Sequence, residues 1–325
     1  MGISITFWGS LGSLPLAVSP DAIEQKINDA LWTARSEDFK SPTEVKQYVA
    51  KLPFSERGTY KGNTTCVQLN HGDSGFVVLC DAGTGLKNYS DSPTYDPSIK
   101  TYHLFISHLH LDHIQGFPFF KPIYEEGNTV IIHSFHKEIE VALRGLFEKN
   151  IFPVEYDSLK ATIVYDIQTE ATEFQLGALH VQSICQNHPS NSWGYRFEQD
   201  DEVIVFSTDA QHNENEINDI KYPFIRFIEN VDILIFDAQH SPGVENASKG
   251  KWGHSDLMTA IKLAAHAKVK KLTIMHHDPC KSDALIELET SKARKMIRDI
   301  NNQLGNQILY PRELMLAYDN LTVEI

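Results

Sequence analysis

Residues 107–113 read Ser-His-Leu-His-Leu-Asp-His, which places four potential metal ligands within six positions. The run follows an apolar stretch over 102–106, so we expect it where a buried strand ends and a loop begins. Alternate residues of an extended backbone point the same way, so His108 and His110 can share one ion. Asp112 and His113 lie just past the turn and can reach a second. Imidazole suits zinc, and carboxylate tolerates zinc, manganese or iron, so the pattern predicts a metal site.

Three further candidate ligands each follow an apolar stretch that is typical of a buried strand. His188 comes after residues 181–185, Asp209 after 203–208 and His276 after 272–275. Any one of them alone fits a hydrogen-bonded polar group in the core equally well. Together with the first run, however, they complete a second set of ligands.

The seven candidates divide into two coordination spheres that share a carboxylate. We assign His108, His110 and His188 to one ion, Asp112, His113 and His276 to the other, and Asp209 to the bridge. Two neighbouring cations repel each other, and a shared carboxylate with a shared hydroxide offsets that repulsion. The sequence therefore predicts two divalent ions, with zinc preferred and manganese or iron as alternatives.

The elements that would position these residues alternate between strands and helices. Strands are predicted near 3–8, 65–70, 75–80, 102–106, 129–133, 162–165, 178–185, 193–198, 202–207, 231–236, 271–275, 307–310, 314–318 and 321–325. Helices are predicted as a pair within 20–52 and then near 136–148, 215–228, 255–267 and 282–304. This order favours two sheets covered by helices in a single domain over 1–325, with a helical insertion at about 20–58.

The amino-acid composition limits the kinds of partner that we expect for this protein. The 325 residues carry 29 basic and 43 acidic side chains, a net charge of -14, which disfavours a long nucleic-acid substrate. Four scattered cysteines form no C-x-x-C pair and suggest free thiols in a reducing compartment. No apolar run reaches membrane-spanning length, and no export signal is evident. We therefore expect a cytoplasmic protein without a membrane partner; a homodimer is left open.

Taken together, the motifs resemble the metallo-β-lactamase superfamily, in the branch near ribonuclease Z and the cyclic phosphodiesterases. The resemblance covers residue 1 to about 280, except the 20–58 insertion. The matching segments are 7–13, 81–83, the run His108-x-His110-x-Asp112-His113, His188, 207–209, 237–239, 253–255 and 272–276. It implies an αββα sandwich, an α/β fold of two mixed sheets flanked by helices, with metals at the strand ends.

The resemblance also suggests roles for a second group of residues. The branch has an acid and a histidine near the leaving oxygen, and Asp237 and His254 match them. The alternative for Asp237 and His254 is a purely structural role, in which a buried hydrogen bond between them connects a strand to a helix. His276 and His277 compete for one ligand position; the resemblance favours His276 and leaves His277 as a substrate-binding group. Asp112 or Asp209 is expected to orient the nucleophile as well as to bind metal.

These residues predict a dinuclear metal-dependent hydrolase acting on a small phosphodiester, cyclic ones included, through a hydroxide that bridges the ions. The alternative is a thioester or lactone hydrolase of the glyoxalase II or lactonase type. A tRNA 3′-processing endonuclease is disfavoured by the acidic charge and by the absence of a basic, glycine-rich arm within 114–187. A non-catalytic binding scaffold would predict missing ligands, and none is missing.

Overall fold

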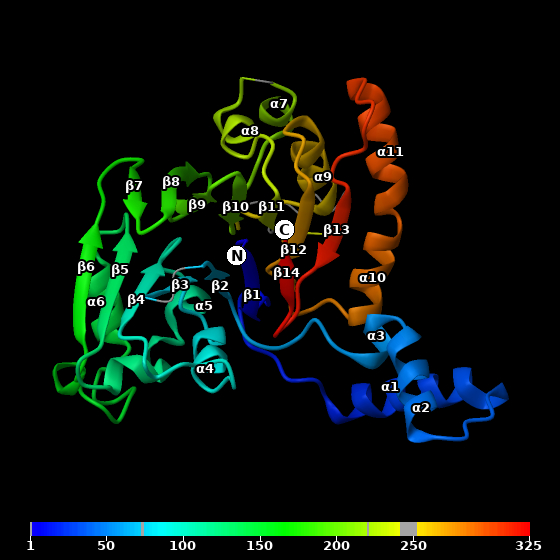
Figure 1. The fold of residues 1–325 in the computed structure, drawn as a ribbon, viewed down its shortest axis with the longest axis horizontal. Coiled ribbons are helices and arrows are strands. Elements are labelled where there is room, and N and C mark those ends of the chain that lie inside the picture. The colour runs from blue at the N-terminus through cyan, green and yellow to red at the C-terminus, as the bar shows by residue number, and fades with distance from the viewer. Residues whose placement is uncertain (1, 73–74, 220, 241–251) are drawn as a thin grey trace.

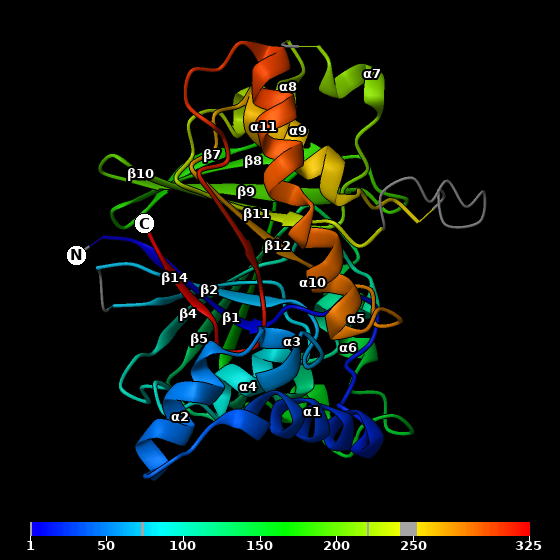
Figure 2. The same ribbon diagram turned by 90° about the vertical axis from the view of Figure 1, so that its right-hand side faces the viewer.

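The computed structural model describes residues 2–325 except 73–74, 220 and 241–251. In this described part of the chain, two seven-stranded mixed sheets pack face to face with helices on both outer faces (Figures 1 and 2). The predicted α/β sandwich of two mixed sheets is therefore confirmed. No helix in the described ranges combines the length and apolarity needed to cross a bilayer.

The first sheet has the strand order β14-β1-β2-β3-β4-β5-β6. Its strands are β1 (Ser4–Gly9), β2 (Cys66–Asn70), β3 (Val77–Cys80), β4 (Thr101–Phe105), β5 (Thr129–Ser134), β6 (Thr162–Ile167) and β14 (Thr322–Glu324). Strands β3 to β6 run parallel, whereas β14, β1, β2 and β3 pair antiparallel. The N- and C-terminal strands thus lie side by side in one sheet (Figure 1).

The second sheet has the order β13-β12-β11-β10-β9-β8-β7. Its strands are β7 (Glu173–Leu176), β8 (Leu179–Gln186), β9 (Ser192–Gln199), β10 (Glu202–Ser207), β11 (Ile233–Asp237), β12 (Lys271–Met275) and β13 (Glu313–Leu316). Strands β10 to β13 are parallel. Their carboxyl ends therefore meet at one edge of the sheet, where a strand-end ligand can face its neighbours.

Alternating side chains separate the core into layers. Ile5 and Phe7 of the first sheet pack with Phe206 and Ile235 of the second in the cluster between the sheets. A second apolar cluster covers the outer face of the second sheet, and a third covers the outer face of the first. This pattern follows from the two-residue period of a strand, which lets each sheet bury both faces.

Helices close the two outer faces. On the first sheet lie α4 (Gly85–Ser90), α5 (Leu111–Ile114), the 3₁₀ turns Phe117–Phe119 and Lys121–Tyr124, and α6 (Ile139–Gly145). On the second lie α7 (Glu214–Ile217), α8 (Pro223–Phe227), α9 (Leu257–His266), α10 (Asp283–Ser291) and α11 (Ala293–Leu304). Further 3₁₀ turns span Ala34–Ser36 and Tyr156–Ser158.

The predicted helical insertion corresponds to α1 (Pro20–Thr33), α2 (Pro42–Lys51) and α3 (Phe54–Arg57). Ser19 and Ser41 cap α1 and α2 as their position before a proline predicts. Neither α1 nor α2 has a buried residue, and both extend away from the sheets (Figure 1). Lys26 of α1 and Tyr60 nevertheless bond the Asp283 carboxylate at the start of α10. That residues 1–325 form a single domain stays a prediction.

Three sequence predictions of secondary structure were wrong. The strand at 307–310 is absent, because the buried Asn301 side chain bonds both the N–H and the C=O of Tyr310. The helix over 282–304 is divided into α10 and α11 near Lys292, where the hydroxyls of Thr290 and Ser291 bond carbonyls of their own helix. The helix over 215–228 is likewise two short helices, the second of which begins at Pro223.

Candidate metal centre

The candidate ligands converge on the edge where strands of both sheets end. His108 and His110 follow β4, Asp112 and His113 lie in α5, and His188, Asp209 and His276 follow β8, β10 and β12. Asp209 and His276 adopt left-handed backbone angles, with φ of 46° and 58°. Such angles are costly for residues other than glycine, of order 1 kcal/mol or more each, and non-glycine residues of this kind gather at functional sites.

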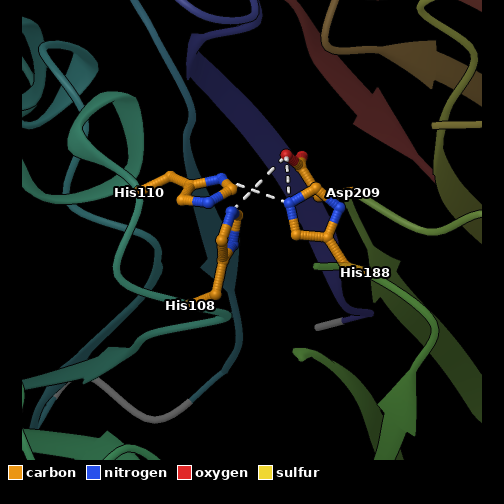
Figure 3. Close-up of side chains that lie close together, drawn as sticks. All are labelled: His108, His110, His188 and Asp209. Atoms are coloured by element: carbon orange, nitrogen blue, oxygen red, sulfur yellow. Dashed lines mark hydrogen bonds and ion pairs between the residues drawn. The ribbon is translucent and has the colours of Figure 1, made fainter. Parts of the chain in front are cut away.

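One group consists of three histidines around one carboxylate oxygen (Figure 3). His108 Nε2 lies 3.6 Å and His188 Nε2 3.8 Å from Oδ2 of Asp209. His110 Nδ1 is 3.2 Å from His188 Nε2. Donor atoms of all four residues lie within 4.8 Å of one another. The structure therefore brings together the first predicted sphere.

The second group surrounds the other oxygen of the same carboxylate. His276 Nε2 lies 3.1 Å from Asp112 Oδ2 and 3.3 Å from Asp209 Oδ1. His113 Nε2 lies 3.4 Å from each of these two oxygens. Asp209 thus directs Oδ2 toward one histidine group and Oδ1 toward the other. This is the arrangement that a bridging carboxylate requires.

The donor set fits cations better than it fits protein partners alone. The Nε2 atoms of His108 and His113 are buried and have no hydrogen-bond partner among the described residues. Burial lowers the pKa of His113, but the carboxylates of Asp209, Asp112 and Asp81 outweigh it and raise that pKa well above its ordinary value. The carboxylates around His113 therefore favour a positive charge at this position, even though its side chain is fully buried.

Hydrogen bonds behind the ligands hold their orientation. Asp81 Oδ2 accepts from His113 Nδ1 at 2.7 Å, and the backbone N–H and hydroxyl of Ser107 donate to the same carboxylate at 2.7 and 2.8 Å. His188 Nδ1 bonds the carbonyl oxygen of Gly253 at 3.0 Å. Bonds of this kind leave Nε2 of each imidazole directed at the centre of the group.

Asp237 and His254 adjoin the candidate ligands. His254 Nδ1 donates to Asp237 Oδ2 at 2.7 Å and lies 4.0 Å from Asp209 Oδ2. Burial opposes the charge on His254, but Asp237 outweighs it and raises the pKa of His254 to about 9. The predicted Asp237–His254 pair is therefore formed, and Asp237 favours the protonated form of its histidine. Asp209, Asp237, His254 and His276 also lie close enough together to form a third potential metal group.

The placement of His277 argues against its predicted role as a substrate-binding residue. Its side chain is only 4% exposed, and Nε2 bonds the carbonyl oxygen of Ala317 at 2.9 Å. Burial lowers the pKa of His277 to about 4, so it is neutral. His276 alone of the pair faces Asp112 and Asp209, because its left-handed backbone turns the next residue toward Ala317.

A cleft of about 340 Å³ opens over the centre. Its lining is Ser13, His110, Asp112, Pro189, Asp209, Trp252, His254 and His276. Sequence reasoning missed Ser13 and Trp252 and assigned no role to Asp81. Ser13, whose backbone N–H bonds Asp112 Oδ2 at 2.8 Å, was within reach, since it belongs to segment 7–13, one of those that carry the family resemblance. No sequence pattern pointed to Trp252.

Comparison with known proteins agrees with this geometry. Residues 77–277 match the family described as the beta-lactamase superfamily domain. A ribonuclease Z of Exiguobacterium sibiricum is 25% identical over 265 residues, covering 70% of this chain and 85% of the relative.

Solved structures extend the likeness to the whole fold. The metallo-beta-lactamase fold protein YhfI of Bacillus subtilis superimposes with a TM-score of 0.60 at 16% identity, covering 99% of each chain. A diphosphatase from the PhnP family gives a TM-score of 0.57 at 16% identity, covering 99% of this chain and 98% of the other. The fold implies divalent metal ions, and the His/Asp groups provide a place for them. The chain therefore belongs to the metallo-β-lactamase superfamily, as a metal-dependent hydrolase in the ribonuclease Z-like branch.

Proposed function

We propose that this protein is a dinuclear phosphodiesterase that hydrolyses small phosphodiesters, cyclic ones included. The observation that carries the proposal is the position of His254, which lines the same cleft as the candidate ligands and is hydrogen-bonded to Asp237. A cationic imidazole beside a metal centre is suited to protonate the alkoxide that leaves when a P–O bond breaks. Thioester hydrolysis has less need of such a group, because a thiolate leaves without protonation.

The two donor groups would each hold one divalent ion, with Asp209 shared between them. Zinc fits the predominance of imidazole, while manganese or iron would also accept the mixed donors. When bound, the ions supply positive charge that stabilises the phosphorane-like transition state and lowers the pKa of water. The carboxylate of Asp112, to which the backbone N–H of Ser13 donates, is placed to orient the attacking water.

His254 would donate the proton. Its Nδ1–H is committed to Asp237, which leaves Nε2–H for the leaving oxygen of the substrate. Asp237 keeps the imidazole in one orientation and stabilises its positive charge, since its carboxylate is completely buried. The proton moves from Nε2 to the departing oxygen, and exchange with water restores the acid after product release.

Size and charge support a small substrate. A cleft of about 340 Å³ is at the lower end of the range for small-molecule sites, about 300–1,000 Å³. The net charge of -14 opposes association with a long polyanion. The relative named ribonuclease Z supports phosphodiester chemistry, whereas the charge argues for a shorter substrate than a nucleic acid. A cytoplasmic location remains part of this proposal.

Parallel assays of substrate classes test the proposal. Protein reconstituted with zinc or manganese should hydrolyse bis(p-nitrophenyl) phosphate and cyclic nucleotides faster than a thioester, a lactone or a cephalosporin. Faster turnover of the thioester or the lactone would overturn the reaction class and leave the fold unaffected. Metal analysis of the same samples should give two ions per chain.

A further inference from the structure

Trp252 lines the cleft over the candidate metal centre, yet its side chain is 53% exposed. Each of the other three tryptophan rings has an aromatic or cation–π partner. Trp193 stacks on Phe135 at 3.5 Å between centroids, Trp8 meets Tyr89 at 5.8 Å, and Arg35 lies 4.4 Å over Trp32. Among the described residues, the ring of Trp252 has no aromatic or cation–π partner. A large apolar ring is thus left open beside the site.

The backbone next to Trp252 is anchored to the centre. The carbonyl oxygen of Gly253 accepts from Nδ1 of His188, a candidate ligand, at 3.0 Å. Gly253 has φ of 81°, and a Cβ there would lie 2.4 Å from His188 Nδ1 and 2.5 Å from Pro189 Cδ. Only glycine allows this close approach. The backbone that carries Trp252 is therefore held beside the candidate metal centre.

The face of an indole ring recognises another planar ring. Stacking of a nucleobase on an aromatic side chain contributes about 1–3 kcal/mol and depends little on which base is present. Pro189, also in the lining, adds apolar surface, while Ser13 supplies a hydroxyl that Gln239 Nε2 bonds at 3.2 Å. The cleft thus combines a charged end for a phosphodiester with an open aromatic surface.

We propose that Trp252 stacks on the nucleobase of the substrate, so that the small phosphodiester is a nucleoside phosphodiester. This inference rests on the proposed phosphodiesterase function and names its substrate class. Trp252 then determines specificity and leaves the chemistry of P–O cleavage to the histidines and aspartates.

Three substrates with one leaving group test the inference. Thymidine 5′-(p-nitrophenyl phosphate), phenyl p-nitrophenyl phosphate and methyl p-nitrophenyl phosphate all release p-nitrophenolate, and they differ in the second ester group. W252A should lower kcat/KM for the thymidine ester about 10- to 100-fold, mainly through KM, which corresponds to the loss of one stacked base. The losses for the phenyl and methyl esters should be clearly smaller, and W252F should recover most of the thymidine activity.

W32A provides a matched control, since Trp32 is 67% exposed but lies on α1 and does not line the cleft. It should match the wild type on all three esters, and W252A should retain the wild-type metal content. Equal losses on all esters, or a phenyl ester as dependent on Trp252 as the thymidine ester, would overturn nucleobase recognition.

A binding measurement separates this inference from the reaction class. Thymidine 5′-monophosphate should quench the tryptophan fluorescence of the wild type and of W32F, and W252F should lose the quenching. If the wild type cleaves none of the esters, the proposed function fails, while the quenching experiment still decides the role of Trp252. Quenching that persists in W252F would overturn it.

Discussion

Two groups of histidines, one at the metal edge between the sheets and one within the first sheet, make an instructive comparison. At the metal edge, histidine nitrogens and carboxylate oxygens lie 3.1–3.8 Å apart, and three buried histidine nitrogens have no hydrogen-bond partner among the described residues. Within the sheet, neighbouring strands β4, β5 and β6 carry His103, His133 and Asp166 in a continuous chain. His103 Nδ1 meets His133 Nε2 at 2.9 Å, and His133 Nδ1 meets Asp166 Oδ2 at 2.7 Å.

The difference shows how a structural histidine can be told from a ligand. In the His103–His133–Asp166 chain, each facing pair has one donor and one acceptor, so no cation is needed. At the metal edge, several Nε2 atoms converge on shared carboxylate oxygens, and the Nδ1 atoms of His113 and His188 are already bonded behind them. Convergence of many donor atoms without partners of their own is the property that indicates a metal.

The largest expected effect comes from the shared carboxylate. Asp209→Ala should reduce the bound metal from two ions to one or none and lower kcat by about 10³-fold or more, because repulsion between the cations is no longer offset. Asp209→Asn, which keeps the shape and removes the charge, is the matched variant and should also lose metal. Elemental analysis of the reconstituted protein measures the outcome; two ions in both variants would disprove the bridge.

The second-largest effect is expected from replacing His254, and it distinguishes proton donation from metal binding. His254→Ala should keep both ions and lose about 10²–10⁴-fold in turnover, the usual range for a missing general acid. The loss should be greater for a ribose leaving group than for p-nitrophenolate, which needs little protonation. Asp237→Asn should give a milder form of the same pattern. Equal losses of turnover with the two leaving groups would mean that the Asp237–His254 pair has a structural role and does not donate the proton.

A smaller effect is expected from replacing a residue that orients a metal ligand. Asp81→Asn should weaken metal binding by about 10–100-fold, since it removes the charged acceptor that orients His113. Competition with a chelator measures the affinity. An unchanged affinity would mean that packing alone positions His113.

Replacing a member of the His103–His133–Asp166 chain should have the opposite result, with a loss of stability and no loss of metal. His133→Phe keeps an aromatic ring against Phe105 but leaves the His103 N–H without its acceptor. We expect a loss of about 1–3 kcal/mol in the free energy of unfolding, the cost of a buried donor without a partner. Metal content should not change, and any loss of metal would blur the distinction between the two groups.

The last expected effect is a dependence of stability on pH. Burial and the neighbouring His133 lower the pKa of His103 to about 4, whereas in the unfolded chain it is near 6.5. The unfolded state therefore binds more protons between these values, and stability should fall as the pH decreases from about 6.5 to 4. Urea unfolding across this range should show a shallower pH dependence in His103→Phe than in the wild type. An identical dependence would assign the titration to other groups.

Much of the centre could be predicted because its information is local. A strand of apolar residues that ends in a histidine or aspartate places that side chain at a sheet edge, and this holds for His188, Asp209 and His276 alike. The order of strands and helices likewise predicted two sheets covered by helices. Local patterns failed where a side chain outside the segment determines its conformation. At 307–310 the Asn301 side chain bonds the backbone N–H and C=O of Tyr310, which a strand would have used.

The sequence by itself determined the ligand types, their order and the sandwich that carries them. Only the tertiary structure decided which of His276 and His277 faces the centre, since this depends on a left-handed backbone and on the carbonyl oxygen of Ala317. It also decided that Trp252 lies over the cleft, through the bond between Gly253 and His188. Side-chain direction at a strand end is set by contacts between residues far apart in the chain, which no local pattern encodes.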